Sequence, residues 1–394
     1  MRICVLTTSY PRAADDDAGI FVKRLVDAYS AQGAQGFVVV PHDKDEPLTA
    51  QEGTFKIQRY RYGIFSAGRL AFGAGVLPNL RVNPWLILQA PFLLLRMLWC
   101  AISLRGSYDV LHANWCMAGL VAWMAALLTG KPYLISVRGE DVRFSRPLLL
   151  RLLLMLPFKQ AAGIVSVNDS FLGELRERYH LSSQKLCTIP NGVEVQPPSA
   201  DALMRFCQRS GLQPQAKYLL FVGTIIPRKR VTILIDLLSR PEMADYSLIL
   251  CGRIDDEQCV QHVQAYAKNC GVQSRLHITG KVSPAEVPYF LSLARCYVSA
   301  SEFEGRSNSV LEACAARLPV CLSDISAHRE LISSAGGFLF TEIDLGAAAA
   351  FILRLDGDAA FREQITKQAY EIVQGLSWEM CAGRYLELLG RACG

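Results

Sequence analysis

The sequence of 394 residues lacks several patterns that would quickly assign a protein to a class. Its 13 cysteines include no Cys-x-x-Cys pair and no spacing typical of metal ligands. An odd and unpatterned set of cysteines argues for reduced thiols in a cytosolic protein rather than for a disulfide framework. We therefore expect no metal site, and we expect most thiols to be small core residues.

Two nucleotide-binding signatures are also missing. The loop after the first expected strand reads TTSYPRAADDDAGIF and holds no G-x-G-x-x-G sequence, which argues against a dinucleotide dehydrogenase. The chain contains no Walker A sequence. The N-terminal MRICVLTTSYP has one arginine and a short apolar run before Pro11, so we expect no signal peptide there.

Strong net charge is absent too. The formal net charge of +5 is too mild to suggest nucleic acid as a partner, and 51% hydrophobic residues indicate a globular protein. The charge is uneven, because residues 1–195 hold 21 Lys and Arg against 15 Asp and Glu, whereas the remainder holds 20 against 21. A basic first half suits an anionic partner such as a phosphorylated lipid or a membrane surface. Ordinary solvated arginines explain it equally well.

Two apolar stretches deserve a test as membrane segments. Residues 84–106 are interrupted by Pro91 and Arg96, and residues 146–159 are too short to cross a bilayer as a helix. Both mix Leu, Trp and Phe with arginines, which is the composition of a helix that lies on a bilayer. The alternative, which we favour, is an ordinary buried helix.

Short β-branched runs alternate with helical patterns and predict parallel βαβ units. The first series of expected strands is 2–9, 37–41, 109–114, 132–138, 163–168 and 186–195, and the second is 218–224, 246–252, 276–280, 296–301, 318–324 and 336–341. Residues 195–203, VQPPSADAL, look like a linker. The fold class is therefore α/β, with two doubly wound, Rossmann-like parallel-sheet domains facing a cleft. In such sheets ligands bind at the carboxyl ends of the strands.

The stretch SEFEGRSNSVLEACAARLPV holds two acids, Glu304 and Glu312, on either side of an expected helix start. Free backbone N–H groups at such a start favour an anion, and Gly305 permits close approach of the backbone. Two acids beside an anion site make sense if each accepts hydrogen bonds from hydroxyl groups of a phosphate-bearing ligand. The alternative is a capping box from Ser309 to Glu312, in which Glu312 only satisfies a backbone donor.

The stretch FVGTIIPRKRVTILIDLL places three cations, Arg228, Lys229 and Arg230, after a strand that ends at Gly223. Cations at a helix N-terminus oppose the helix dipole, and a bound polyanion would remove that conflict. The alternative is a solvated run of charge.

These stretches resemble glycosyltransferase family 4, whose members have the GT-B fold. The E-x7-E spacing of Glu304 and Glu312 matches the family motif, and FVGTIIPRKR resembles its glycine-lysine loop. Further similar segments run along nearly the whole chain: TTSYP…AGIFVKRL, YDVLHANW, SVRGEDV, TIPNGV, ITGKVSP and LSWEMCAGRYLELL. The resemblance implies an N-terminal acceptor-side domain at 1–195, a nucleotide-sugar-binding domain at 196–377, and a C-terminal helix at 378–394 that packs back on the first.

The resemblance also implies a metal-independent glycosyltransferase that retains anomeric configuration and takes a nucleoside-diphosphate sugar as donor, without a cofactor. Glu304, Lys229 and Arg228 would be catalytic, with Lys229 on the diphosphate and Glu304 on the sugar hydroxyls. Glu312 would bind the ribose hydroxyls. The other implied donor-binding residues are Gly19, Gly223, Gly280, Gly305, Arg306, Ser307 and Asn308.

The chain departs from the family pattern at two positions. Thr224 replaces an arginine, which Arg228 could supply instead, and Arg138 replaces a histidine near the donor sugar. Arg138 could bind an acidic sugar or phosphate, or pair with Glu140 or Asp141. Asp141 could orient donor or acceptor, or cap the following helix.

Two other features leave a structural and a functional interpretation open. His112 is a candidate site residue or a hydrogen-bonded core histidine. Asn191-Gly192 is a turn signal that could also act as a hinge.

We expect a cytoplasmic transferase that acts on a glycan or lipid-linked acceptor in polysaccharide biosynthesis, and peripheral contact with the inner face of the plasma membrane is an open alternative. Two alternatives from other classes are a GT-B-like nucleotide-sugar epimerase or hydrolase and a degenerate, non-catalytic assembly subunit.

Overall fold

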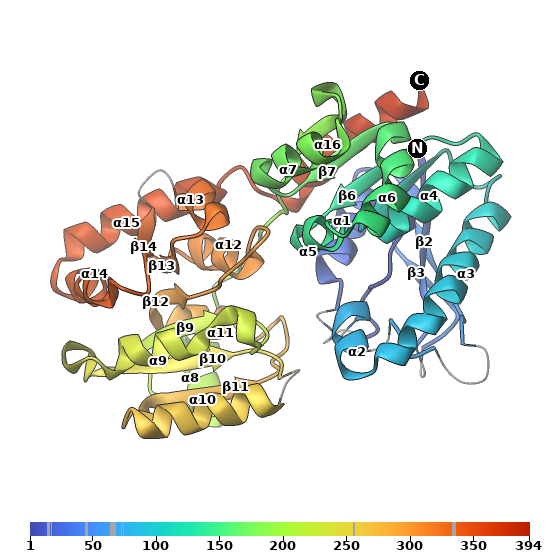
Figure 1. Cartoon of the computed structure of the whole chain (residues 1–394). Helices are drawn as coiled ribbons and strands as arrows, with labels where there is room; N and C mark the ends of the chain where they lie inside the picture. The colour runs from blue at the N-terminus through green and yellow to red at the C-terminus, as the bar shows by residue number, and fades with distance from the viewer. Residues whose placement is uncertain are drawn as a thin grey trace. The chain divides into compact units, whose positions relative to one another are not determined.

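A computed structural model of the chain describes all residues except 14, 15, 17, 44, 45, 64–67, 72, 74, 255, 256 and 333–335. Two compact units divide it: residues 1–192 with 378–394 form the first unit, and residues 193–377 form the second. Each unit is an α/β domain built on its own sheet (Figure 1). The chain passes between them after Gly192, slightly before the boundary at 195 that the sequence suggested.

The first unit contains an eight-stranded sheet in the order β3-β4-β2-β1-β5-β6-β7-β8. Its strands are β1 Arg2–Leu6, β2 Gln35–Pro41, β3 Thr49–Glu52, β4 Phe55–Tyr60, β5 Val110–Asn114, β6 Tyr133–Val137, β7 Gly163–Ser166 and β8 Leu186–Thr188. Its helices are α1 Ile20–Ala31, α2 Val76–Val82, η1 Pro84–Gln89, α3 Ala90–Ser103, α4 Cys116–Thr129, α5 Gly139–Phe144, α6 Leu148–Gln160, α7 Asp169–Tyr179, η2 Ser183–Lys185 and α16 Trp378–Cys393. Every pairing is parallel except that of β3 with β4, so the sheet is mixed.

The second unit contains a six-stranded parallel sheet in the order β11-β10-β9-β12-β13-β14. Its strands are β9 Lys217–Val222, β10 Tyr246–Cys251, β11 Leu276–Gly280, β12 Ala294–Ser299, β13 Val320–Ser323 and β14 Gly337–Phe340. Its helices are α8 Ala200–Ser210, η3 Pro227–Lys229, α9 Val231–Ser239, η4 Pro241–Met243, α10 Glu257–Asn269, η5 Gln273–Arg275, α11 Val287–Leu293, α12 Asn308–Ala315, α13 Ser326–Ile332, α14 Leu345–Gly357 and α15 Ala359–Val373.

The twelve expected strands are all present, which confirms the alternating βα pattern. The sequence missed the hairpin of β3 and β4. The expected linker at 195–203 is partly wrong, because α8 begins at Ala200, where the Ser199 side chain accepts a hydrogen bond from the Ala202 N–H.

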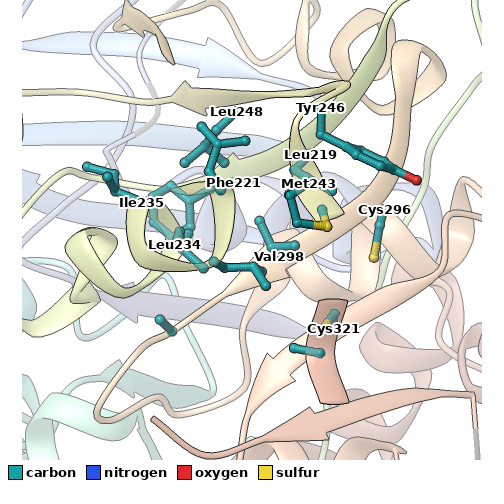
Figure 2. Packing of buried hydrophobic residues seen from close by; sticks show 14 of the residues in the cluster. Leu219, Phe221, Leu234, Ile235, Met243, Tyr246, Leu248, Cys296, Val298 and Cys321 are labelled. Atoms are coloured by element: carbon teal, nitrogen blue, oxygen red, sulfur yellow. The ribbon is translucent and has the colours of Figure 1, made fainter. Parts of the chain in front are cut away.

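Both faces of the second sheet are covered, so its strands read as continuous apolar runs. One core cluster packs α9 on β9 and β10: Leu234 and Ile235 meet Leu219, Phe221 and Leu248 (Figure 2). The tight packing of these fully buried side chains holds the carboxyl ends of the strands in fixed positions. The loops that follow those ends are therefore presented by a rigid support.

The C-terminal helix α16 belongs to the first unit. Its residues Trp378, Ala382 and Tyr385 are buried in the same core cluster as Tyr29 of α1. Gly192 is required where the chain leaves this unit, because a Cβ there would lie 2.3 Å from the backbone nitrogen of Trp378. The Asn-Gly dipeptide thus permits close approach of two backbones.

Candidate active site

The winding of the second sheet changes direction between β9 and β12. These strands are neighbours, yet β10 and β11 extend the sheet on one side and β13 and β14 on the other. In open α/β sheets, ligands bind outside the carboxyl ends of the strands at such a switch point. The two loops that open there are residues 223–230 after β9 and 301–307 after β12, which hold half of the site residues that the sequence predicted.

Three charged side chains from these loops form one cluster, hereafter the Lys229 cluster: Arg228, Lys229 and Glu304. The Lys229 ammonium forms an ion pair with Oε1 of Glu304, and a guanidinium nitrogen of Arg228 lies 3.7 Å from Oε2. The same guanidinium donates a hydrogen bond to the backbone oxygen of Phe303. Arg228 therefore adds a second cation to the cluster beside Lys229.

The Lys229 cluster is largely withdrawn from solvent, since the side chains of Lys229 and Glu304 are only 13% and 10% exposed. Burial by itself raises the pKa of Glu304, but the charges of Lys229 and Arg228 outweigh it and hold the pKa below its usual value. Glu304 is therefore ionised at neutral pH. Two cations against one carboxylate leave the cluster with a net positive charge.

The expected helix across all three cations is only partly correct. Arg228 and Lys229 lie in the single turn η3, and Arg230 takes a left-handed conformation (φ 44°) before α9 begins. Arg230 turns away from the Lys229 cluster, since its Nε donates to the backbone oxygen of Ala300 and its guanidinium pairs with Glu342. Of the three consecutive cations, Arg228 and Lys229 thus face Glu304, whereas Arg230 pairs with Glu342.

Helix α12 begins directly after the second loop, with Ser307 at its N-cap. The capping box from Ser309 to Glu312 is wrong, because Glu312 lies in the second turn of a helix that starts earlier. Gly305, Arg306 and Asn308 occupy the approach and first turn of α12, where helix N–H groups point outward.

Tyr297 of β12 connects the end of β9 with the first turn of α12, and no sequence pattern predicted this role. Its hydroxyl donates to the backbone oxygen of Val222 at 3.3 Å and lies 2.8 Å from the Ser309 hydroxyl, which in turn meets Ser307 at 3.0 Å. Burial raises the pKa of Tyr297, and the nearby carboxylates of Glu304 and Glu312 raise it further. Both acids of the E-x7-E motif therefore lie near one buried hydroxyl.

Backbone hydrogen bonds that involve glycines connect the ends of β9, β10 and β11. The Gly223 N–H donates to the Cys251 oxygen at 2.9 Å, and the Gly252 N–H donates to the Gly280 oxygen at 3.1 Å. A Cβ on Gly252 would lie 2.1 Å from the Gly223 oxygen, so only glycine fits there. Gly223 and Gly280 were expected at the site; Gly252 was missed, although its place at the end of a predicted strand was a usable signal.

His328 of α13 is another residue that the sequence did not single out. It is 1% exposed, and its Nδ1 lies 2.8 Å from the backbone oxygen of Ser323. Burial lowers its pKa, whereas the hydrogen bond with Ser323 and the charge of Glu304 raise it.

The remaining predicted residues belong to the first unit. Gly19 caps α1 with φ 71°, and a Cβ there would lie 2.4 Å from the Ser9 oxygen, so the loop after β1 itself requires glycine. A small pocket lies at the carboxyl ends of β1 and β2, lined in part by Ser9, Arg12, His42 and Arg59.

His112 is a fully buried residue of β5. Its Nδ1 lies 3.2 Å from the Tyr29 hydroxyl and its Nε2 lies 2.7 Å from the Ser136 hydroxyl, which donates to Tyr385. Burial lowers the pKa of His112 to about 3, with a smaller effect from Arg138, so the ring is neutral. This is the arrangement of the core histidine that the sequence left open.

Arg138 and Asp141 lie at the start of α5. The Arg138 guanidinium donates to Oδ1 of Asn191 and lies 4.5 Å from the centre of the Phe21 ring. Asp141 is the third residue of that helix rather than its N-cap, and it caps the helix start from there: its carboxylate accepts from the backbone N–H of Arg138, the N-cap residue, and from that of Cys116, both at 2.7 Å. Burial raises the pKa of Asp141 to about 6 although these hydrogen bonds lower it.

Two Rossmann-like domains, the second with a cationic switch-point site, define the class of GT-B glycosyltransferases. Residues 18–192 match the family described as Glycosyl transferase 4-like domain, and residues 205–372 match the family described as Glycosyl transferases group 1. The chain therefore belongs to the glycosyltransferases that combine these two domains.

Two curated relatives carry more specific names. O-antigen chain mannosyltransferase B of Escherichia coli is 27% identical over 55% of this chain and 58% of its own length. UDP-Gal:alpha-D-GlcNAc-diphosphoundecaprenol alpha-1,3-galactosyltransferase of Escherichia coli is 22% identical over 69% of this chain and 73% of its own length.

Solved structures share the fold over nearly the whole chain. Sucrose-phosphate synthase of Thermosynechococcus elongatus gives a TM-score of 0.81 at 20% identity and covers 99% of this chain and 98% of its own. The Anabaena protein Alr3699/HepE in complex with UDP-glucose gives 0.75 at 16% identity and covers 99% and 100%.

Proposed function

We propose that the protein is a retaining, metal-independent glycosyltransferase that moves a sugar from a nucleoside-diphosphate sugar to a lipid-linked or membrane-bound glycan intermediate in polysaccharide biosynthesis. The observation that carries the proposal is the Lys229 cluster at the switch point of the second sheet, next to the N-terminus of α12. Fixed positive charge beside outward-pointing N–H groups suits a diphosphate leaving group.

The reaction exchanges one bond for another at the anomeric carbon. An acceptor hydroxyl oxygen forms a bond to the anomeric carbon while the bond between that carbon and the β-phosphate oxygen breaks. The proton of the acceptor hydroxyl passes to the departing phosphate. The leaving group gains negative charge as the bond breaks. Lys229 and Arg228 stabilise that charge most in the transition state, so their main effect is on the rate of transfer.

Glu304 has a second role besides holding Lys229. A carboxylate has room for about four hydrogen bonds, so Glu304 can keep its ion pair with Lys229 while it accepts hydrogen bonds from hydroxyl groups of the donor sugar. Its lowered pKa keeps it ionised and therefore a pure acceptor. In this proposal Glu312, one turn further along α12, accepts from the ribose hydroxyls.

The nature of the acceptor is supported by the relatives and by the composition of the first unit. The names of the two relatives refer to an O-antigen chain and to a diphosphoundecaprenol-linked sugar, which are a bacterial surface glycan and a lipid-linked intermediate. The protein would then work in the cytoplasm, at the inner face of the plasma membrane.

A thermal-shift screen with UDP, GDP and ADP sugars tests the proposal first, because a ligand that binds the native state raises its melting temperature. We expect one base to be selected, with a shift that Lys229→Ala reduces. The selected donor is then incubated alone: rapid conversion to an epimer or free sugar without acceptor would identify an epimerase or hydrolase. No shift with any nucleotide sugar would identify a non-catalytic subunit and contradict the proposal.

A further inference from the structure

Exposed apolar side chains are concentrated in one part of the first unit. Of the 22 exposed large hydrophobic residues in the described part of the chain, 15 fall between Val82 and Leu156. Soluble monomers rarely expose a continuous apolar area of this kind unless it binds something. The interpretation of these segments as ordinary buried helices, which the sequence favoured, is therefore wrong for their outer faces.

Three neighbouring helices carry these side chains. Helices α3 and α6 both pack against α4, on the same face of the sheet, so the three form one layer (Figure 1). We define the docking surface as the outer face of η1, α3 and α6 with the end of α4. It contains Trp85, Ile87, Leu88, Phe92, Leu95, Trp99, Leu127, Leu128, Leu148, Leu149, Leu152, Leu153, Met155 and Leu156.

Several side chains of the docking surface are mostly exposed to solvent. Trp85, Trp99 and Leu149 are 77%, 66% and 78% exposed. The inner face of α3 is occupied by Leu93, Met97 and Ala101, which are nearly fully buried. Helix α3 therefore has one apolar face buried in the core and a second apolar face exposed to solvent.

The segments that carry the docking surface contain cations and no acids of their own, although Arg146 pairs with Glu174 of α7. Residues 84–106, 116–132 and 142–160 together hold seven Lys and Arg and no Asp or Glu. Arg96 lies among the exposed apolar residues of α3, and Lys159 lies exposed at the end of α6. A surface of this composition complements an anionic apolar layer, because long cationic side chains can reach headgroups while tryptophans occupy the interface.

We propose that the docking surface binds a lipid bilayer that contains anionic lipids, with η1, α3 and α6 lying in the plane of the membrane. A second copy of the chain is the less favoured occupant, because two such surfaces would bring the exposed Arg96 and Lys159 of each copy near like charges. The inference deepens the proposed function and rests on it in one respect. Membrane docking would bring the enzyme to a lipid-linked acceptor, which lies in the bilayer.

The alternative to a helix that lies on the membrane is a helix that crosses it. Within the described residues, one helical stretch is long and apolar enough to cross a membrane, Pro84–Ser103 with mean hydropathy 1.7 and 17% buried. Its inner residues, however, pack on α4 and on the strands β1, β2 and β4. Crossing the bilayer would strip these contacts and open the core, so the stretch lies on the membrane.

Vesicle flotation with the purified full chain, without nucleotide sugar, tests the inference. We expect binding to phosphatidylcholine vesicles that contain 30% phosphatidylglycerol, as a round choice of composition, and binding at least about tenfold weaker to phosphatidylcholine alone. Trp85→Glu and Leu149→Glu should each weaken binding at least about tenfold, since both place charge in an apolar interface. Ile343→Glu is the matched control, because Ile343 is 99% exposed on the second unit and should bind unchanged.

A charge variant and a spectroscopic measurement guard against misfolded proteins. Arg96→Gln with Lys159→Gln should retain the fold and lose about fivefold in binding per cation removed, in anionic vesicles only. Brominated lipids should quench the fluorescence of the wild type, and the conservative Trp85→Phe, Trp99→Phe variant should lose most of that quenching.

Three results would overturn the inference. One is the absence of binding to anionic vesicles. Another is equal binding by wild type and the Glu variants. The third is a dimer in sedimentation velocity that Leu149→Glu dissociates while vesicles remain unbound. Because no donor is present, each of these results is separate from a failure of nucleotide-sugar binding.

Discussion

The two units are similar in architecture and opposite in the character of their surfaces. The first unit holds 23 Lys and Arg against 16 Asp and Glu, and the second holds 18 against 20. The second unit holds a largely buried cluster of charge, where Lys229, Arg228 and Glu304 meet. In the first, the predicted site residues are engaged with the protein itself, and the unusual feature is an apolar outer layer.

This difference teaches that a shared fold does not distribute function evenly. The switch point of the second sheet is assembled as a charged site, whereas the corresponding residues of the first unit mainly hold helices in place. We therefore expect substitutions in the second unit to change chemistry and those in the first to change stability or location. The predictions below test that division, from the largest expected effect to the smallest.

Lys229→Ala should lower kcat by about a hundredfold to a thousandfold, the usual loss when one preorganised electrostatic stabiliser is removed. The effect on donor KM should be smaller, because the leaving-group charge peaks in the transition state. Steady-state transfer kinetics measure both. Lys268→Ala, on the exposed face of α10, is the control. A change confined to KM would contradict the role of Lys229 in the chemical step.

His112→Ala should lower the free energy of unfolding by about 2–4 kcal/mol, because it opens a cavity, removes the partner of the buried Tyr29 hydroxyl and leaves the Ser136 hydroxyl with Tyr385 alone. Urea unfolding at neutral pH measures the loss, with exposed His262→Ala as control. Donor binding by the folded variant should be unchanged. Lost donor binding with full stability would show instead that His112 belongs to the site.

Asp141 should make stability depend on pH. Its pKa is about 6 in the folded protein against an ordinary 3.8, so the folded state holds the proton more tightly and unfolding releases it between these values. Stability from this group is present below pH 3.8, falls as pH rises to 6, and is constant above; the fall is about 3 kcal/mol. Asp141→Asn should remove it, as chemical unfolding at several pH values will show. An unchanged pH profile would count against the buried, protonatable carboxyl.

Glu312→Ala should weaken nucleotide binding by about tenfold, which is the loss of one or two hydrogen bonds to a charged acceptor. Calorimetric titration measures the affinity, and Glu363→Ala on the exposed face of α15 is the control. If both variants bind like the wild type, Glu312 does not hold the ribose.

Much of the fold followed from the sequence because the β-branched runs and helical patterns alternate so regularly. The hairpin of β3 and β4 did not, because Thr49–Glu52 is a short polar edge strand whose pairing depends on its neighbour rather than on its own composition. The capping box failed for a related reason. Ser307, Asn308 and Ser309 are all residue types that favour an N-cap, so the sequence alone does not say that the helix begins after Ser307.

The site was predicted as a set of residues but not as a set of contacts. Lys229 and Glu304 are 75 positions apart, and their ion pair depends on β9 and β12 being neighbours, which no local pattern reveals. The exposed apolar face of α3 could not be predicted from the sequence either. A helix that is apolar on most sides fits a core or a membrane, and the sequence does not say which face is left uncovered.

The affinity difference between a nucleoside diphosphate and its monophosphate tests the central claim most directly. The base selected in the thermal-shift screen is titrated in both forms against the wild type and Lys229→Ala. If the Lys229 cluster holds the diphosphate, the diphosphate will bind the wild type at least about tenfold more tightly, and the variant will lose most of that preference. Equal affinities in the wild type, or a preference that survives in Lys229→Ala, would contradict the account.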